Sequence, residues 1–137
     1  HSQLHILPAH FLHAEGNFHF YDPISRILFT GDLGVSLTDG YIARTPVTDL
    51  GPHIARMEGF HRRYMVSNKV LRLWVAMARQ LDISLIVPQH GAPIMGRAIE
   101  QFFDWLDHLM CGIDLMDNQS YTLPHAPISP QPVAAAR

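Results

Sequence analysis

The stretch PAHFLHAEGNFHFYDPISRILFTGDLG, residues 8–34, decides the fold class. Within it, aromatic residues 18–21 and apolar residues 27–30 predict two strands joined by a turn at Asp22-Pro23. The short apolar run from Leu4 to Pro8 predicts another strand just before them. This part of the chain is therefore expected to form a small sheet built on a hairpin.

The remainder of the chain alternates helices with one buried strand. Ile83 to Val87 is nearly all apolar, which is typical of a strand buried on both faces in a parallel pairing. A polar loop over residues 38–52 comes first, and the apolar spacing then predicts helices over 52–64, 67–81 and 97–110. The sequence thus predicts an α/β fold in which helices cover a sheet.

Composition excludes several classes of protein. The chain is 47% hydrophobic with a formal net charge of −2, so it carries no basic footprint for nucleic acid or an anionic membrane. No apolar run approaches the ~20 residues that a membrane span needs. The single cysteine, Cys111, fits a reducing compartment, and we expect a cytoplasmic protein.

The chain divides into a folded part and a tail. Residues 1–116 carry the predicted elements, whereas residues 117–137 are expected to be a tail or linker rich in proline and alanine. The sequence begins at His1 rather than Met, and a strand-like segment follows within a few residues. We therefore expect a piece of a larger protein.

Three candidate metal ligands each follow the end of an apolar run. His13 follows the first strand, Asp32 the second strand of the hairpin, and His90 the buried strand at 83–87. Strand ends in α/β folds meet at one edge of the sheet, where active sites form. Imidazole and carboxylate ligands suit iron, zinc or manganese, and a carboxylate such as Asp32 can bridge two ions.

The ordered motifs resemble those of the metallo-β-lactamase superfamily. Residues 8–34 are similar to its segment with a metal-binding histidine, a Gly-Asn pair and a bridging "GD" aspartate, and PQHGAPIMG (88–96) resembles its last histidine motif. The combination, with GFHRRYM (59–65) and FFDWLDHLMCGIDL (102–115), is closer to flavodiiron proteins and oxygen-binding di-iron proteins. The resemblance implies the C-terminal half of a four-layer αββα sandwich.

The same resemblance assigns the metal site. It implies that His13 binds the first metal, Asp32 bridges, His90 binds the second, and the metals are two irons, with zinc as the alternative. The family's H-x-E-x-D-H segment is lacking here, so the missing N-terminal half-domain is an expected partner, from the same gene or another chain. The relatives also suggest a homodimer, and any flavin site is expected outside this chain.

Four further residues are candidates for the pocket or for contacts with the ligands: His10, Glu15, His61 and Tyr64. His61 and Tyr64 could donate hydrogen bonds to a metal-bound oxygen species, although such residues are more often buried polar groups paired with neighbours. Glu15 is as compatible with a solvated loop. None is assigned a catalytic role.

Three functions remain open from the sequence. The first is a non-haem di-iron protein that binds or reduces dioxygen or nitric oxide, with an oxygen sensor as one form of this function. The second is a zinc-dependent hydrolase of the same fold, whose metals activate water. The third is an interaction or dimerisation module that has lost half its ligands. If the chain is an enzyme, it is a flavodiiron-like oxidoreductase or a metallohydrolase.

Overall fold

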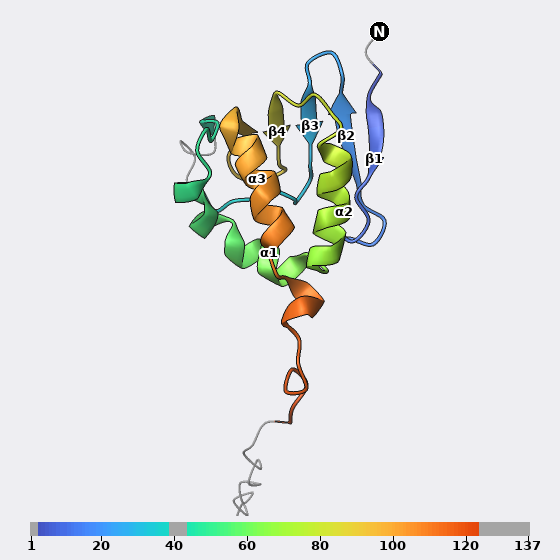
Figure 1. Cartoon of the computed structure of the whole chain (residues 1–137), viewed down its shortest axis with the longest axis vertical. Coiled ribbons are helices and arrows are strands. Elements are labelled where there is room, and N and C mark those ends of the chain that lie inside the picture. The colour runs from blue at the N-terminus through green and yellow to red at the C-terminus, as the bar shows by residue number, and fades with distance from the viewer. Residues whose placement is uncertain (1–2, 39–43, 124–137) are drawn as a thin grey trace, which may run out of the picture.

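The computed structural model describes residues 3–38 and 44–123, whose strands form one five-stranded sheet in the order β1-β2-β3-β4-β5 (Figure 1). The strands are β1 (His5–Pro8), β2 (Phe18–Asp22), β3 (Ile27–Phe29), β4 (Leu85–Val87) and β5 (Ile94–Met95). Neighbours pair antiparallel except β3 and β4, which pair in parallel. The predicted hairpin and the predicted parallel strand are both confirmed.

Three α-helices and two short 3₁₀ helices complete the described part of the chain. They are η2 (Gly51–Arg56), α1 (Glu58–Tyr64), α2 (Asn68–Ala78), α3 (Arg97–His108) and η3 (Gly112–Leu115). The last two predicted helices are confirmed as α2 and α3, with earlier C-terminal ends than expected.

The single helix expected over residues 52–64 was wrong, because the segment is η2 followed by α1. The tighter turn of η2 is visible in backbone hydrogen bonds from His53 N to Leu50 O (2.8 Å) and from Met57 N to Ile54 O (2.9 Å). Pro52 lies at the start of η2, where its missing N–H costs nothing. Short 3₁₀ segments of this kind commonly connect longer elements.

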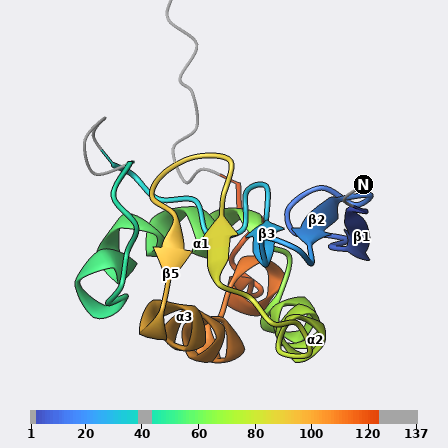
Figure 2. The same ribbon diagram turned by 90° about the horizontal axis from the view of Figure 1, so that it is seen from above.

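The core lies between the sheet and the helices α2 and α3, which Figure 2 shows on one side of the strands. Alternation along the strands sends Tyr21, Leu28 and Ile86 toward these helices, and all three are buried. Helices α2 and α3 contribute the fully buried side chains Leu71 and Phe102 to this core. Because every second strand residue points here, the remaining residues point to the opposite face.

That opposite face, which we call the open sheet face, is apolar and exposed. In the described part of the chain no helix or strand covers it. The register places Ile6 opposite Phe20 and Phe20 opposite Phe29, so their side chains form a continuous row. Ile6 is 65% exposed, and Phe18, Phe20, Phe29 and Met95 are exposed as well.

Candidate metal centre

The first two predicted ligands meet at the edge of the sheet. His13 lies in the loop between β1 and β2, and Asp32 lies in the turn that follows β3. His13 Nε2 is 3.3 Å from Asp32 Oδ2, and both side chains are partly exposed. Because β1 and β3 each pair antiparallel with β2, they run in the same direction and end at the same edge of the sheet. The loops at this edge thus bring residues 19 positions apart in sequence into contact.

The third predicted ligand, His90, lies in the loop after β4 at the same edge. Gln89 N donates to Gly31 O (2.6 Å) and Ser36 N donates to His90 O (3.4 Å), which fastens this loop to the one that carries Asp32. The His90 side chain is exposed. Within residues 3–38 and 44–123 no three His, Cys, Asp or Glu side chains are grouped closely enough to hold a metal. The structure therefore joins the backbones of the loops that carry Asp32 and His90, and it pairs the side chain of Asp32 with that of His13.

The turn that carries Asp32 is held by local contacts. Thr30 is fully buried, and its hydroxyl donates to Leu33 O at 2.6 Å. Gly31 and Gly34 adopt positive φ angles of 53° and 100°, which glycine tolerates at little cost. These residues explain why the strand ends abruptly and turns the carboxylate toward His13.

His61 supports this turn from α1. It is fully buried; its Nδ1 donates to Met57 O (2.8 Å) and its Nε2 accepts from Gly34 N (2.9 Å). With one nitrogen donating and the other accepting, the ring is a neutral imidazole. Burial lowers its pKa to about 4, against the opposing effects of the Met57 hydrogen bond and the Asp32 charge. His61, a candidate for the pocket, thus lies beneath the Asp32 turn.

The loop that carries His13 is held by residues for which the sequence predicted no specific role; Asn17 was noted only as part of the Gly-Asn pair. Ala9 N donates to Asn17 O (3.0 Å), which closes the base of the loop, and the Asn17 side-chain amide donates to Leu12 O. Behind Asn17 lies fully buried His19, whose Nδ1 accepts from Trp74 Nε1 at 3.0 Å. Burial lowers the pKa of His19 to about 4.

One feature of the sequence indicates that the His19 side chain is buried. It alternates with exposed Phe18 and Phe20 in β2, so it had to face the core with Tyr21 two residues on. Its partner Trp74 is 55 residues away, on α2, and no local pattern predicts that hydrogen bond.

The other candidate residues have different surroundings. The Tyr64 ring lies 5.6 Å from the His13 ring, and Phe60 adds an edge contact at 6.2 Å, so α1 forms an aromatic wall beside His13. His10 packs edge-on against Phe18 (5.2 Å) and lines a hollow next to α2. Glu15 is exposed in its loop.

The donor atoms fit a metal ion in part. Protein N and O ligands bind such metals at about 2.1 Å, so two ligands of one ion lie roughly 3.0 to 3.5 Å apart. The 3.3 Å between His13 Nε2 and Asp32 Oδ2 matches this spacing. A complete two-metal site needs more ligands than the described residues bring together. The additional ligands would come from residues other than His13 and Asp32.

The sheet, the covering helices and the ligand-bearing loops at one sheet edge define the class, an α/β protein of the metallo-β-lactamase type. Within that class, residues 1–91 match the family model described as ODP family beta lactamase. The chain belongs to this family, and the predicted fold and family resemblance are confirmed. No curated protein matches the sequence.

Solved structures agree with this assignment. Two structures of the chemotaxis sensor ODP match at 43% identity, each covering 83% of this chain and 47% of the other: a peroxy diiron species (TM-score 0.77) and an apo state from T. denticola (TM-score 0.78). The flavodiiron protein from Giardia intestinalis matches at 18% identity and TM-score 0.64, over 79% of this chain and 27% of that one, which shows the fold alone. The chain spans about half the length of the ODP sensor it matches.

No helix among the described residues has both the length and the hydropathy to cross a membrane.

Proposed function

We propose that this chain forms one half of an oxygen-sensing domain with a non-haem di-iron site, in which His13, Asp32 and His90 are iron ligands. The observation that carries the proposal is the His13–Asp32 pair at the sheet edge, 3.3 Å apart, in a chain 43% identical to the chemotaxis sensor ODP. Two irons, when bound, would supply the redox chemistry that binds dioxygen. Asp32 would bridge the irons, because a carboxylate offers two oxygens.

This chain's own residues would set the surroundings of the irons. His61 holds the Asp32 turn through Gly34, and the Tyr64 and Phe60 rings lie against His13. Tyr64 is a phenol next to a ligand and can donate a hydrogen bond to an oxygen ligand in the site. Because the chain is 43% identical to a chemotaxis sensor, we propose sensing of dioxygen rather than rapid reduction of dioxygen or nitric oxide.

The remaining ligands are proposed to come from a complementary half-domain that covers the open sheet face. The ODP sensor structures extend over about twice the length matched here, since the match covers 47% of that chain. A contiguous exposed apolar row such as Ile6, Phe20 and Phe29 is typical of a surface that another layer covers. Because the single cysteine favours a reducing compartment, we propose that this assembly is cytoplasmic.

The test is metal content measured by plasma mass spectrometry, on protein produced without air and with iron and zinc both supplied. The 137-residue chain is compared with the chain co-produced with a half-domain that carries an H-x-E-x-D-H segment. We expect about two irons per assembled site, and a new visible absorption band when air is admitted. Zinc with no spectral response would instead indicate the hydrolase.

Single substitutions make the test specific to the three loops. His13→Ala, Asp32→Ala and His90→Ala should each lower iron content and abolish the band. The matched control is His53→Ala, which removes a buried histidine of η2 that is not among the proposed ligands. A His90→Ala variant that retains full iron, the band and its thermal midpoint would contradict the ligand role and favour a metal-deficient interaction module.

A further inference from the structure

The segment after α3 carries apolar side chains that its own domain leaves exposed. Residues 113–123, which we call the arm, begin in η3, and the chain beyond η3 extends away from the sheet and helices in Figure 1. Tyr121 is 88% exposed and Leu123 is 87% exposed. Ile113, Leu115 and Met116 are exposed too. An apolar segment of this kind is typical of a surface that binds another protein.

The arm is held by its own polar contacts near its middle. Asp117 N donates to Ser120 Oγ (2.9 Å), Gln119 N donates to Asp117 Oδ1 (2.9 Å), and Ser120 N donates to Asp117 O (3.1 Å). At its root, Asp114 Oδ2 accepts from Asn68 N at 2.5 Å. The turn is therefore formed before any partner arrives, which reduces the ordering cost of binding. The arm contains Asp114 and Asp117 and no Lys or Arg.

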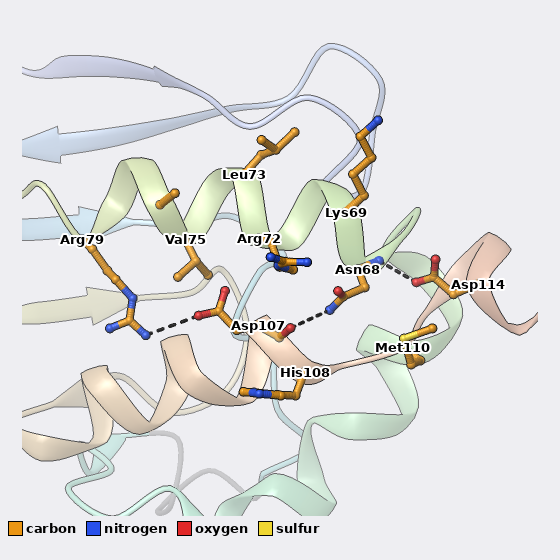
Figure 3. Close-up of a pocket in the computed structure, with 11 residues that line it drawn as sticks. Asn68, Lys69, Arg72, Leu73, Val75, Arg79, Asp107, His108, Met110 and Asp114 are labelled. Atoms are coloured by element: carbon orange, nitrogen blue, oxygen red, sulfur yellow. Dashed lines mark hydrogen bonds and ion pairs between the residues drawn. The ribbon is translucent and has the colours of Figure 1, made fainter.

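A complementary surface lies on α2, centred on Leu73, which is 65% exposed. On one side of Leu73 is a hollow of about 290 Å³ lined chiefly by apolar side chains, including Phe11, Leu12, Val70, Trp74 and Met77. On its other side, a groove between α2 and α3 is lined by Lys69 and Arg72 (Figure 3). We call Leu73, the hollow and these two cations the α2 surface.

The two cations are available to a partner. In the described part of the chain, Arg26, Arg62, Arg79 and Arg97 are in ion pairs, whereas Lys69 and Arg72 have none. Figure 3 shows Arg79 turned to Asp107 and Lys69 pointing to the side away from α3. The free positive charge of the α2 surface thus lies beside an apolar hollow.

We propose that the α2 surface of one copy of this chain binds the arm of a second copy. Apolar side chains of the arm, Tyr121 or Leu123, would fill the hollow beside Leu73, and Asp117 would face Lys69 and Arg72. Two copies that exchange arms in this way make the same contact twice about a two-fold axis, so the assembly closes as a dimer.

The charges around the groove favour this occupant over an extended polyanion. Besides Arg72, the groove is lined by Asp107 and Asp114. Asp107 shares the cation Arg79 with Glu100 and Asp104, which lie near it on α3. A nucleic acid or anionic membrane would be repelled by these carboxylates. The part of the arm beyond η3 has one carboxylate, Asp117, and several apolar side chains, so this repulsion acts on it far less than on a polyanion.

The first test is disulfide crosslinking between two different single-cysteine variants. Leu73→Cys protein is mixed with Tyr121→Cys protein in a thiol-disulfide buffer, and we expect a covalent dimer that contains one chain of each. The native Cys111 does not interfere, because it is fully buried and burial raises its pKa to about 11. The control pairs Tyr121→Cys with Ile24→Cys, an exposed position in the turn between β2 and β3.

Equal crosslinking of Tyr121→Cys to positions 24 and 73 would overturn the proposal. So would a Leu73→Cys/Tyr121→Cys double variant that forms its disulfide only within one chain, because the arm would then fold back on its own domain. Neither readout requires iron, so the outcome is independent of the proposed function.

The second test is the mass of two truncated chains by sedimentation equilibrium. A chain that ends at Leu123 keeps the arm and should dimerise like the 137-residue protein, whereas one that ends at Met116 should be monomeric. Lys69→Glu/Arg72→Glu should weaken the dimer about tenfold or more, with Arg62→Glu/Arg63→Glu as the control of equal charge change. Dimers that survive removal of residues 117–123 would contradict the proposal and indicate association through another surface such as the open sheet face.

Discussion

Two fully buried histidines, His19 and His61, are kept neutral, and they hold the two loops on which the candidate metal site depends. His19 accepts the Trp74 indole N–H, and His61 accepts the Gly34 amide. Burial lowers the pKa of each ring to about 4. A charged imidazole at either place would lose the acceptor nitrogen that its partner needs.

The stability of the fold should fall when the pH is lowered from about 6.5 to about 4. The unfolded His19 ring binds a proton near pH 6.5, whereas the folded ring, with its pKa lowered to about 4, does not. As the pH falls, the unfolded state therefore binds protons before the folded state does. Each such histidine lowers the free energy of unfolding by up to about 1.4 kcal/mol per pH unit in this window. Urea unfolding across the window should show a shallower loss for His19→Gln than for the parent or for His5→Gln, an exposed histidine. Parallel profiles for all three would contradict this.

Replacing His61 by a residue without a hydrogen-bond acceptor should destabilise the Asp32 turn more than replacing it by a residue of different size that keeps an acceptor. His61→Leu leaves the buried Gly34 N–H without a partner, which costs about 1 to 3 kcal/mol. His61→Gln retains an acceptor and should recover part of the loss. The measurements are the free energy of unfolding and, in the assembled site, iron content. Equal tolerance of Leu and Gln would show that His61 only fills space.

At this scale the sequence predicted which loops lie together at the sheet edge but not the residues that support them. His13, Asp32 and His90 each follow an apolar run, so their placement at one sheet edge followed from pattern alone. The hydrogen bonds that hold the loops join residues 27 positions apart for His61 and Gly34, and 55 apart for Trp74 and His19. No local periodicity encodes such pairs.

Among the elements, the ones with a repeating pattern were predictable and the short ones were not. Helices α2 and α3 have apolar faces over 11 and 12 residues, which is enough for the helical period to be clear. Strand β5 has two residues and was missed, because its strand character depends on pairing with β4. Ser67 precedes α2 and its side chain makes no cap hydrogen bond; Asp114, 46 residues further along the chain, accepts from Asn68 N instead.

The turn between β4 and β5 should require glycine at position 91. Gly91 has a φ of 92°, and a Cβ there would lie 2.6 Å from Ser36 O and 2.7 Å from Ser36 N. Gly91→Ala must therefore strain the backbone and push apart the loops that carry His90 and Asp32, at a cost of about 1 to 3 kcal/mol. Chemical denaturation measures this cost.

Gly59→Ala is the matched control for that substitution. A Cβ at Gly59 meets open space within helix α1, so alanine should raise stability by about 0.5 to 1 kcal/mol. If the two alanine variants have the same stability, the close approach of Gly91 to Ser36 is not maintained in solution.

The whole molecule is a layered structure with one layer uncovered. The core between the sheet and α2 and α3 is closed by fully buried side chains such as Leu28 and Phe102, so the chain can bury apolar area on one face of the sheet. Its other face exposes Ile6, Phe20 and Phe29 in one row. The division of residues 1–116 and 117–137 into domain and tail stays a prediction, and residues 124–137 lie outside the described part.

The open sheet face should bind the apolar dye anilinonaphthalene sulfonate in the folded chain. Phe20 lies at the centre of the row, so Phe20→Glu should lower dye fluorescence severalfold, while an exposed substitution changes the free energy of unfolding by about 0.5 kcal/mol or less. Ile24→Glu, which replaces another exposed apolar side chain in the turn between β2 and β3, is the control. The same Phe20→Glu substitution should prevent pairing with a complementary half-domain and thereby lower iron content, although Phe20 is not a proposed ligand. If dye binding and iron content are unchanged in Phe20→Glu, the complementary half must pack on a different surface.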